Sequence, residues 1–271
     1  MDKETSMKTL VKTLVITGGS SGIGLATVQR FARKGWRVFE LSRHGESCGE
    51  NIVHIPCDVT DEASVCQAIS TVMTQTDHLD VVISNAGLGI SGPIEFTASD
   101  DAHRQFDVNF FGAFHLVKAV LPILRTQRYG RILFTSSVAA VLSIPYQSFY
   151  SASKSAINAM ALALANEVRP WGIKVAVLMP GDVATGFTDA RKKETHGQDI
   201  YTHTRTAVEA MEHDERNGMT PDEMAQILYR MATCRSLSPQ YIGGMPYKFF
   251  CFLNRILPVR LVNWIVGKLY A

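Results

Sequence analysis

Tyr150 and Lys154 have the residue types and the spacing that proton transfer requires. They form Tyr150-Ser-Ala-Ser-Lys154 at the start of a segment with helical apolar spacing, and residues four apart lie on one face of a helix. A free tyrosine has a pKa of about 10, but a neighbouring cation stabilises its phenolate. We therefore expect Lys154 to lower the pKa of Tyr150, which could then exchange a proton with an alcohol or carbonyl oxygen. Such pairs also occur by chance on surface helices, so this interpretation depends on further residues.

Small or hydrogen-bonding residues follow several predicted strands. Ser137 follows the strand at 131–136, and its hydroxyl could hold a carbonyl oxygen. The other strand ends carry Asn85-Ala86-Gly87, Pro180-Gly181 and Asp58-Val59. The carboxyl ends of parallel strands meet at one edge of the sheet, where open α/β folds bind ligands, so these residues predict one common site.

A glycine-rich turn, TGGSSGIG at 17–24, joins a predicted strand to a predicted helix. Free backbone N–H groups and the helix dipole at such a turn suit a phosphate, and a pyrophosphate is the natural ligand. The spacing Gly-x-x-x-Gly-x-Gly differs from the dinucleotide fingerprint Gly-x-Gly-x-x-Gly. The alternative is a turn that only reverses the chain.

The rest of the chain supplies the elements that must position these residues. Strands are predicted at 13–16, 37–41, 51–55, 79–84, 131–136 and 174–179, and helices at about 61–75, 99–127 and 149–168. This alternation predicts a single-domain α/β fold with a doubly wound parallel sheet of Rossmann type over residues 1–271. We expect a core at about 12–186, a strand-free substrate loop acting as a helical lid at about 186–220, and a C-terminal extension at about 239–271.

In this order and spacing, the motifs resemble those of the short-chain dehydrogenase/reductase family over about residues 12–186. They are TGGSSGIG, Asp58-Val59, Asn85-Ala86-Gly87, Asn109, Ser137, Tyr150-x-x-x-Lys154 and PGDVAT at 180–185. The resemblance implies an NAD(P)-dependent oxidoreductase that forms a homodimer or homotetramer.

The resemblance also implies a role for each site residue. Tyr150 would be the general acid/base, Ser137 would orient the substrate carbonyl, Lys154 would bind the nicotinamide ribose, and Asn109 would hold a water in a proton relay. The implied cofactor-binding residues are Gly18, Ser20, Ser21, Gly22, Ile23, Gly24, Ser42, Arg43, Asp58, Val59, Asn85, Ala86, Gly87, Tyr150, Lys154, Pro180, Gly181, Val183 and Thr185. A catalytically quiet sensor or scaffold that binds NADP is the alternative.

The choice of cofactor depends on the residues after the second strand. Ser42 and Arg43 stand where an NAD-preferring relative would be expected to carry an aspartate, and a guanidinium matches a 2′-phosphate. NADP(H) is therefore the expected cofactor. Glu40 could instead reach a ribose, which would favour an NAD-dependent alcohol dehydrogenase, and Arg43 could be an ordinary surface arginine.

The substrate is expected to be small and hydrophobic. The side chains predicted to line its pocket are Leu88, Val138, Leu142, Ile144, Tyr146 and Phe187. This wall favours a steroid-, retinoid-, bile-acid- or lipid-like ketone, aldehyde or alcohol, and the overall layout resembles the hydroxysteroid and retinol dehydrogenase branch.

The amino-acid composition limits which kinds of partner this chain is expected to bind. The 271 residues are 46% hydrophobic with a net charge of +2, which argues against disorder and against a dedicated nucleic-acid binder. The cysteines, at 48, 57, 66, 234 and 251, include no Cys-x-x-Cys pair, which indicates a reducing, cytoplasmic compartment and no metal site. The polar start, MDKETSMKT, does not resemble a secretory signal, and no segment offers 18 consecutive apolar residues.

The C-terminal part of the chain differs from the rest. Residues 224–271 contain six basic residues and no acidic one, and 247–271 read as two short amphipathic helices separated by Pro258. This extension could touch an anionic membrane surface, cap an apolar substrate pocket, or pack on the domain or on a second subunit.

Overall fold

A seven-stranded parallel sheet forms the centre of the molecule. The computed structural model describes residues 11–47 and 49–270, so Cys48 and the N-terminal segment 1–9 discussed above lie outside the described residues. The strands are β1 (Thr13–Thr17), β2 (Arg37–Ser42), β3 (Ile52–Pro56), β4 (Val81–Ser84), β6 (Gly130–Thr135), β7 (Ile173–Pro180) and β9 (Gln240–Gly243). Their order is β3-β2-β1-β4-β6-β7-β9, and every pairing is parallel, which confirms the predicted doubly wound fold.

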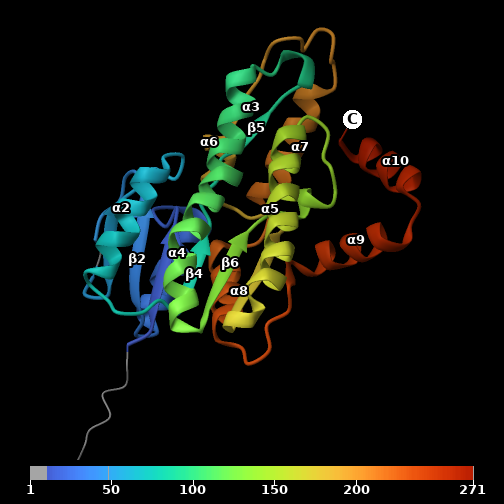
Figure 1. Cartoon of the computed structure of the whole chain (residues 1–271). Coiled ribbons are helices and arrows are strands. Elements are labelled where there is room, and N and C mark those ends of the chain that lie inside the picture. Colours follow the sequence, from blue (N-terminus) through green and yellow to red (C-terminus); the bar gives the residue numbers. More distant parts are fainter. Residues whose placement is uncertain (1–10, 48, 271) are drawn as a thin grey trace, which may run out of the picture.

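Helices cover both faces of this sheet (Figure 1). One face packs against α2 (Glu62–Met73), α4 (Gly112–Gln127) and α5 (Ser148–Glu167), and the other against α1 (Gly22–Arg33) and α8 (Pro221–Thr233). Because both faces are buried, the central strands are continuous apolar runs rather than alternating ones. The sheet is therefore a rigid platform whose carboxyl edge stays free for a site.

The helical run from 99 to 127 has three parts. These are α3 (Ser99–Phe106), one π-helical turn (Asp107–Phe111) and α4. The run is long and apolar enough to cross a membrane, but Leu116, Val120 and Leu124 are fully buried against the sheet. Core packing thus explains part of its hydrophobicity.

Helices α1 and α8 pack closely against each other although about 200 residues separate them in the sequence. The Phe31 and Tyr229 rings meet edge to face at 5.1 Å, and Arg30 forms an ion pair with Asp222 at 2.6 Å. Thr220 and Glu223 form a reciprocal capping box at the start of α8. The helix that follows the glycine-rich turn therefore packs on an element from the C-terminal half.

Two expectations about the second half of the chain need correction. The segment at 186–220 is not free of strands. It contains α6 (Phe187–Ala190), β8 (Lys192–Lys193) and α7 (Thr204–Arg216) in that order, and β8 pairs with β5 (Ile90–Ser91). The extension does not begin at 239, because β9 pairs with β7 and is the edge strand of the main sheet.

The extension proper consists of α9 (Met245–Ile256) and α10 (Val259–Tyr270), with Pro258 between them as predicted. Helix α9 runs away from the sheet, and α10 turns back toward α7 (Figure 1). Short 3₁₀ turns complete the chain at Ile94–Phe96, Val138–Ala140 and Arg169–Trp171.

The described cysteines, Cys57, Cys66, Cys234 and Cys251, are all free thiols. Within 11–47 and 49–270, no three His, Cys, Asp or Glu side chains are grouped as metal ligands would be.

Candidate active site

A cavity of about 730 Å³ opens at the carboxyl edge of the sheet. It gathers residues from the glycine-rich turn and from the ends of β2, β3, β4, β6 and β7. The sequence-predicted residues that line it are Gly18, Ser20, Ser21, Gly22, Ile23, Ser42, Arg43, Asp58, Val59, Asn85, Ala86, Gly87, Ser137, Tyr150, Lys154, Pro180, Gly181, Val183 and Thr185. Gly24 and Asn109, which were also predicted, do not line the cavity and lie behind residues that do.

The glycine-rich turn has the shape that a pyrophosphate needs. Gly18 has φ +66°, and a Cβ there would lie 2.8 Å from the Cα of Ala86. A Cβ on Gly24 would lie 2.0 Å from the carbonyl oxygen of Gly18, which also accepts a hydrogen bond from Asn85 Nδ2 at 3.0 Å. The first turn of α1 contains no acidic residue. This cradle of backbone N–H groups at a helix N-terminus fits the diphosphate of a dinucleotide.

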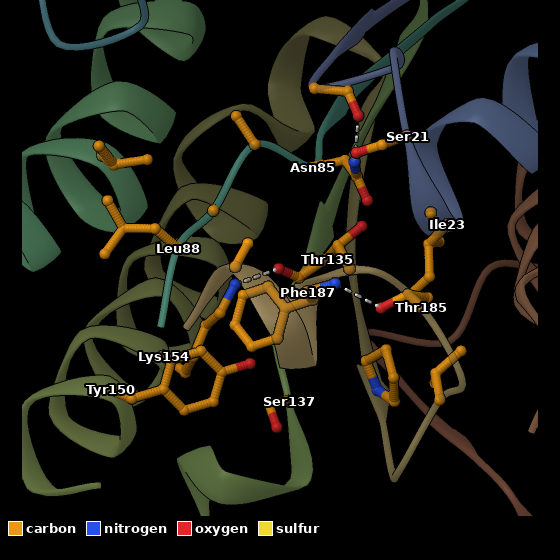
Figure 2. Close-up of a pocket in the computed structure, with 18 of the residues that line it drawn as sticks. Ser21, Ile23, Asn85, Leu88, Thr135, Ser137, Tyr150, Lys154, Thr185 and Phe187 are labelled. Carbon is orange, nitrogen blue, oxygen red and sulfur yellow. Dashed lines mark hydrogen bonds between the residues drawn. The ribbon is translucent and has the colours of Figure 1, made fainter. Parts of the chain in front are cut away.

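Tyr150 and Lys154 lie side by side on α5, and the phenol points toward Ser137 (Figure 2). The Lys154 ammonium lies 5.7 Å from the centre of the Tyr150 ring and donates to the carbonyl oxygen of Thr135 at 3.0 Å. Ser137 lies two residues beyond the end of β6, and its hydroxyl accepts a hydrogen bond from Ala139 N at 3.1 Å. Two separate parts of the chain, α5 and the segment after β6, thus bring an acid, a cation and a hydroxyl together.

The expected effect of Lys154 on Tyr150 is wrong for this structure. Burial raises the pKa of Tyr150 to about 12, and hydrogen bonding with Ser137 only partly opposes this rise. Burial also lowers the pKa of Lys154 to about 8. Desolvation is the largest cause of both shifts, and the charge of Lys154 is not among the causes of the Tyr150 shift.

Asn109 lies in the π-helical turn and is buried. Its Oδ1 accepts from Leu88 N at 2.9 Å, and its Nδ2 donates to Leu88 O at 3.1 Å and to Ser153 Oγ at 3.0 Å. The side chain therefore ties the loop after β4 to α5, which carries Tyr150. Turns of this kind are frequent at functional sites.

The end of the cavity after β2 distinguishes the two candidate groups for the cofactor ribose. Arg43 is exposed and lines the cavity with Ser42. Glu40 is buried and does not line it, because its carboxylate accepts from Gly19 N at 2.9 Å and bonds to the His54 ring at 2.6 Å. Glu40 thus holds the glycine-rich turn in place and Arg43 faces the cavity.

The other end of the cavity is apolar but not wholly so. Leu88, Val138, Ile144 and Phe187 line it as predicted, and the Phe187 ring lies 5.7 Å from that of Tyr150. Leu142 and Tyr146 do not line it, which corrects the prediction. Met211, a residue of the 186–220 segment that could adapt to an apolar ligand, also lines it, and sequence reasoning missed Thr135, Asp182, Glu215 and Tyr270.

The sequence contains a signal for some of the missed residues and none for the others. Asp182 directly follows Pro180-Gly181, so the strand-end argument that selected that pair could have included it. Glu215 and Tyr270 lie on α7 and α10, and no motif marks them.

This geometry agrees with the comparisons with known proteins. The family model described as short chain dehydrogenase matches residues 12–196. The chain belongs to the short-chain dehydrogenase family. It is 35% identical over 264 residues to 3-ketodihydrosphingosine reductase of Bacteroides thetaiotaomicron, a match that covers 95% of this chain and 97% of the relative. It is 34% identical over 190 residues to human retinol dehydrogenase 8, covering 65% of this chain and 60% of that one.

A solved short-chain dehydrogenase/reductase has the same fold. The protein from Burkholderia phymatum, in complex with NAD, superposes with a TM-score of 0.80 at 23% identity, covering 90% of this chain and 92% of the other. This short-chain dehydrogenase is therefore an NAD(P)-dependent oxidoreductase of Rossmann type.

Proposed function

We propose that this chain is an NADPH-dependent reductase of a hydrophobic, lipid-like ketone or aldehyde. The observation that carries the proposal is the half-buried Tyr150 phenol, which faces Ser137 in a cavity whose substrate end has largely apolar walls. A protonated acid suits reduction, in which the substrate oxygen must gain a proton.

In the proposed reaction the carbonyl carbon gains a hydride and the carbonyl oxygen gains a proton. NADPH supplies the hydride when it is bound and leaves as NADP⁺. The Tyr150 hydroxyl donates the proton to the oxygen, which the Ser137 hydroxyl holds. The Lys154 ammonium would bind the hydroxyls of the nicotinamide ribose, and Asn109 would hold a water from which Tyr150 regains its proton.

Arg43 supports NADPH over NADH. A guanidinium at the ribose end binds a 2′-phosphate through charge-assisted hydrogen bonds. Glu40, which could have favoured NAD, is occupied by Gly19 and His54.

The relatives support a lipid-like substrate, because their names concern 3-ketodihydrosphingosine and retinol. Both names describe long apolar molecules that carry an oxygen function. The apolar side chains Val138, Ile144, Phe187 and Met211 would accommodate such a chain.

The test is NADPH consumption with long-chain ketones, retinal and steroid ketones, with Tyr150→Phe as the matched variant. We expect the wild type to reduce at least one class, and Tyr150→Phe to bind NADPH with similar affinity while its turnover falls by about 10²–10⁴, the contribution of a positioned general acid. Turnover that survives in Tyr150→Phe would overturn the assignment.

The C-terminal helices support peripheral contact with an anionic membrane as a further part of this proposal. No side chain of α10 is buried, and Val259, Trp264 and Leu269 are 82%, 61% and 62% exposed. Lys248, Arg255, Arg260 and Lys268 provide positive charge without an acidic neighbour on either helix.

Vesicle flotation tests this contact. We expect the protein to float with phosphatidylserine vesicles and much less with phosphatidylcholine vesicles, and Trp264→Glu to abolish flotation. Truncation at 238 would be a poor test because it removes β9. Equal flotation of wild type and variant would show that α10 does not bind the membrane. A wild-type dimer that dissociates in Trp264→Glu would show that the exposed face of α10 instead binds a second copy of the chain.

Self-association and location complete the proposal. Phe111, Phe114 and Leu162 are 38–44% exposed on the outer side of the α4 and α5 region, which supports a homodimer or homotetramer formed through these helices. Light scattering of Phe114→Glu would show whether that face is an interface.

The free cysteines support a cytoplasmic location.

A further inference from the structure

The Glu40 carboxylate lies just behind the lining of the cavity at its ribose end. Its Oε1 accepts a hydrogen bond from Gly19 N at 2.9 Å, and its Oε2 accepts one from Ser42 Oγ at 3.2 Å. Ser42 lines the cavity, and Gly19 precedes Ser20, which lines it too. The carboxylate is 3% exposed and does not line the cavity, yet one hydrogen bond separates it from a side chain that does.

His54 on β3 holds the carboxylate in this position. Glu40 and His54 are paired residues of neighbouring strands, and His54 Nδ1 lies 2.6 Å from Glu40 Oε2. Because a carboxylate accepts and does not donate, the ring is the donor of this bond. A Cβ on Gly45 would lie 2.6 Å from His54 Nδ1 and 2.8 Å from Glu40 Oε2, so backbone covers the pair. A charge-assisted bond that is shielded from water is stronger than an exposed one.

Without His54, the carboxylate would have room to turn toward the cofactor. A side chain with no donor at position 54 leaves Glu40 Oε2 with Ser42 alone, and a buried carboxylate that loses a donor is costly unless it moves to another donor or to water. His54 also lines a second hollow of about 620 Å³, which shares Ser20 and Arg43 with the main cavity. The ribose end of the cavity therefore adjoins the space that a change at His54 would open.

The two cofactors respond in opposite ways to a carboxylate at the ribose end. NADH carries a 2′-hydroxyl there, which can donate a hydrogen bond to a carboxylate. NADPH carries a 2′-phosphate, which a carboxylate repels. A released Glu40 would also compete with the phosphate for the Arg43 guanidinium.

We propose that His54 is a specificity-determining residue, because it holds the Glu40 carboxylate behind the cavity lining and so keeps the ribose end free for the 2′-phosphate of NADPH. His54 acts through Glu40 and is therefore a positioning residue. This inference rests on the proposed use of NADPH and adds a residue that controls it.

The test measures the dissociation constants of NADPH and NADH by calorimetry, which needs no turnover. His54→Val removes the donor and suits a strand, and we expect it to weaken NADPH binding about 10- to 100-fold, the range for a hydrogen bond to a charged group. NADH binding should stay or improve, whereas a merely structural role of His54 would weaken both equally. His54→Asn keeps an amide donor near the position of Nδ1 and should retain most of the preference.

A second substitution shows whether the effect passes through Glu40. Glu40→Gln removes the charge, so the double variant Glu40→Gln/His54→Val should regain most of the NADPH affinity that His54→Val loses. The matched control is His196→Leu, which breaks the 2.5 Å bond between His196 and Glu194 outside the cavity lining and should keep the wild-type preference. His54→Leu repeats the measurement if His54→Val does not fold.

Three results would overturn the inference and leave the NADPH preference of the wild type intact. They are an unchanged preference in His54→Val, equal losses for the two cofactors, and a double variant that binds NADPH as weakly as His54→Val. A wild type that binds NADH as tightly as NADPH would reject both the proposed cofactor and this inference. If the preference shifts as expected but no ketone or aldehyde is reduced, the inference is supported and only the reductase proposal fails.

Discussion

Replacing Gly24 by alanine tests whether the glycine-rich turn is as tight as the structure shows. The added Cβ would lie 2.0 Å from Gly18 O and 2.7 Å from Asn85 Nδ2. Real Cβ contacts essentially never fall below 3.0 Å, so the turn must open by about 1 Å against backbone, not against a flexible side chain.

The magnitude follows from this displacement. Overpacking of a close-packed site costs typically 1–3 kcal/mol, and a clash with backbone belongs at about 3 kcal/mol. For a chain of this size each kcal/mol lowers Tm by about 2–4 °C, so we expect Gly24→Ala to melt about 6–12 °C below the wild type. Because the same displacement moves Gly18, affinity for NADPH should fall as well.

The assay is thermal melting with and without NADPH, and Gly267→Ala is the matched control. A Cβ at Gly267 in α10 meets nothing within 4 Å, and alanine is the better helix former, so Tm should stay or rise slightly. Equal melting temperatures and equal NADPH affinity for Gly24→Ala and the wild type would refute the reasoning, because the turn would then open without cost.

Two further predictions concern charge. Arg43→Asp should weaken NADPH binding about 100-fold with little change for NADH, because it replaces an attraction to the 2′-phosphate by a repulsion. A titration with both cofactors checks this. Equal losses of affinity for the two cofactors would contradict it. In the ligand-free protein burial lowers the pKa of Lys154 from 10.5 to about 8, so the unfolded chain binds more protons between these values. Lys154→Met should therefore be more stable than the wild type at pH 7, by up to about 3 kcal/mol at 1.36 kcal/mol per pKa unit, and urea melts should show this gap closing as pH rises toward 10.5. A gap that stays constant or widens with pH would show that burial does not govern this lysine.

The sequence predicts the sheet and the grouping of Ser137, Tyr150 and Lys154 in one cavity well, because both depend on local signals. Apolar runs between glycine-rich turns place the strands, and Ser137 and Tyr150 are marked by their position after a strand and at a helix start. Strand β9 was missed because it is only four residues long and half-exposed, so no apolar period distinguishes it.

The substrate end of the cavity was predicted less well because it depends on contacts between distant parts of the chain. Tyr270 packs against the cluster that contains Met211. The sequence offered capping of an apolar pocket by the C-terminal extension as one of several alternatives, and nothing local to residue 270 selects it. The pKa of Tyr150 was predicted in the wrong direction for a similar reason. The spacing of Tyr150 and Lys154 shows the attraction between them, but only the folded structure shows how much water both side chains lose.

The packing of α1 on α8 joins the cofactor site to the second half of the chain. The N-terminus of α1 is built to hold a phosphate, while its body is fixed to α8 through Phe31, Tyr229 and the Arg30–Asp222 pair. Anything that steadies α1 must therefore also restrain α8. Amide hydrogen exchange in 221–233 should slow when the dinucleotide binds, although none of these residues lines the cavity, so occupancy of the site is reported by a helix that never touches the ligand.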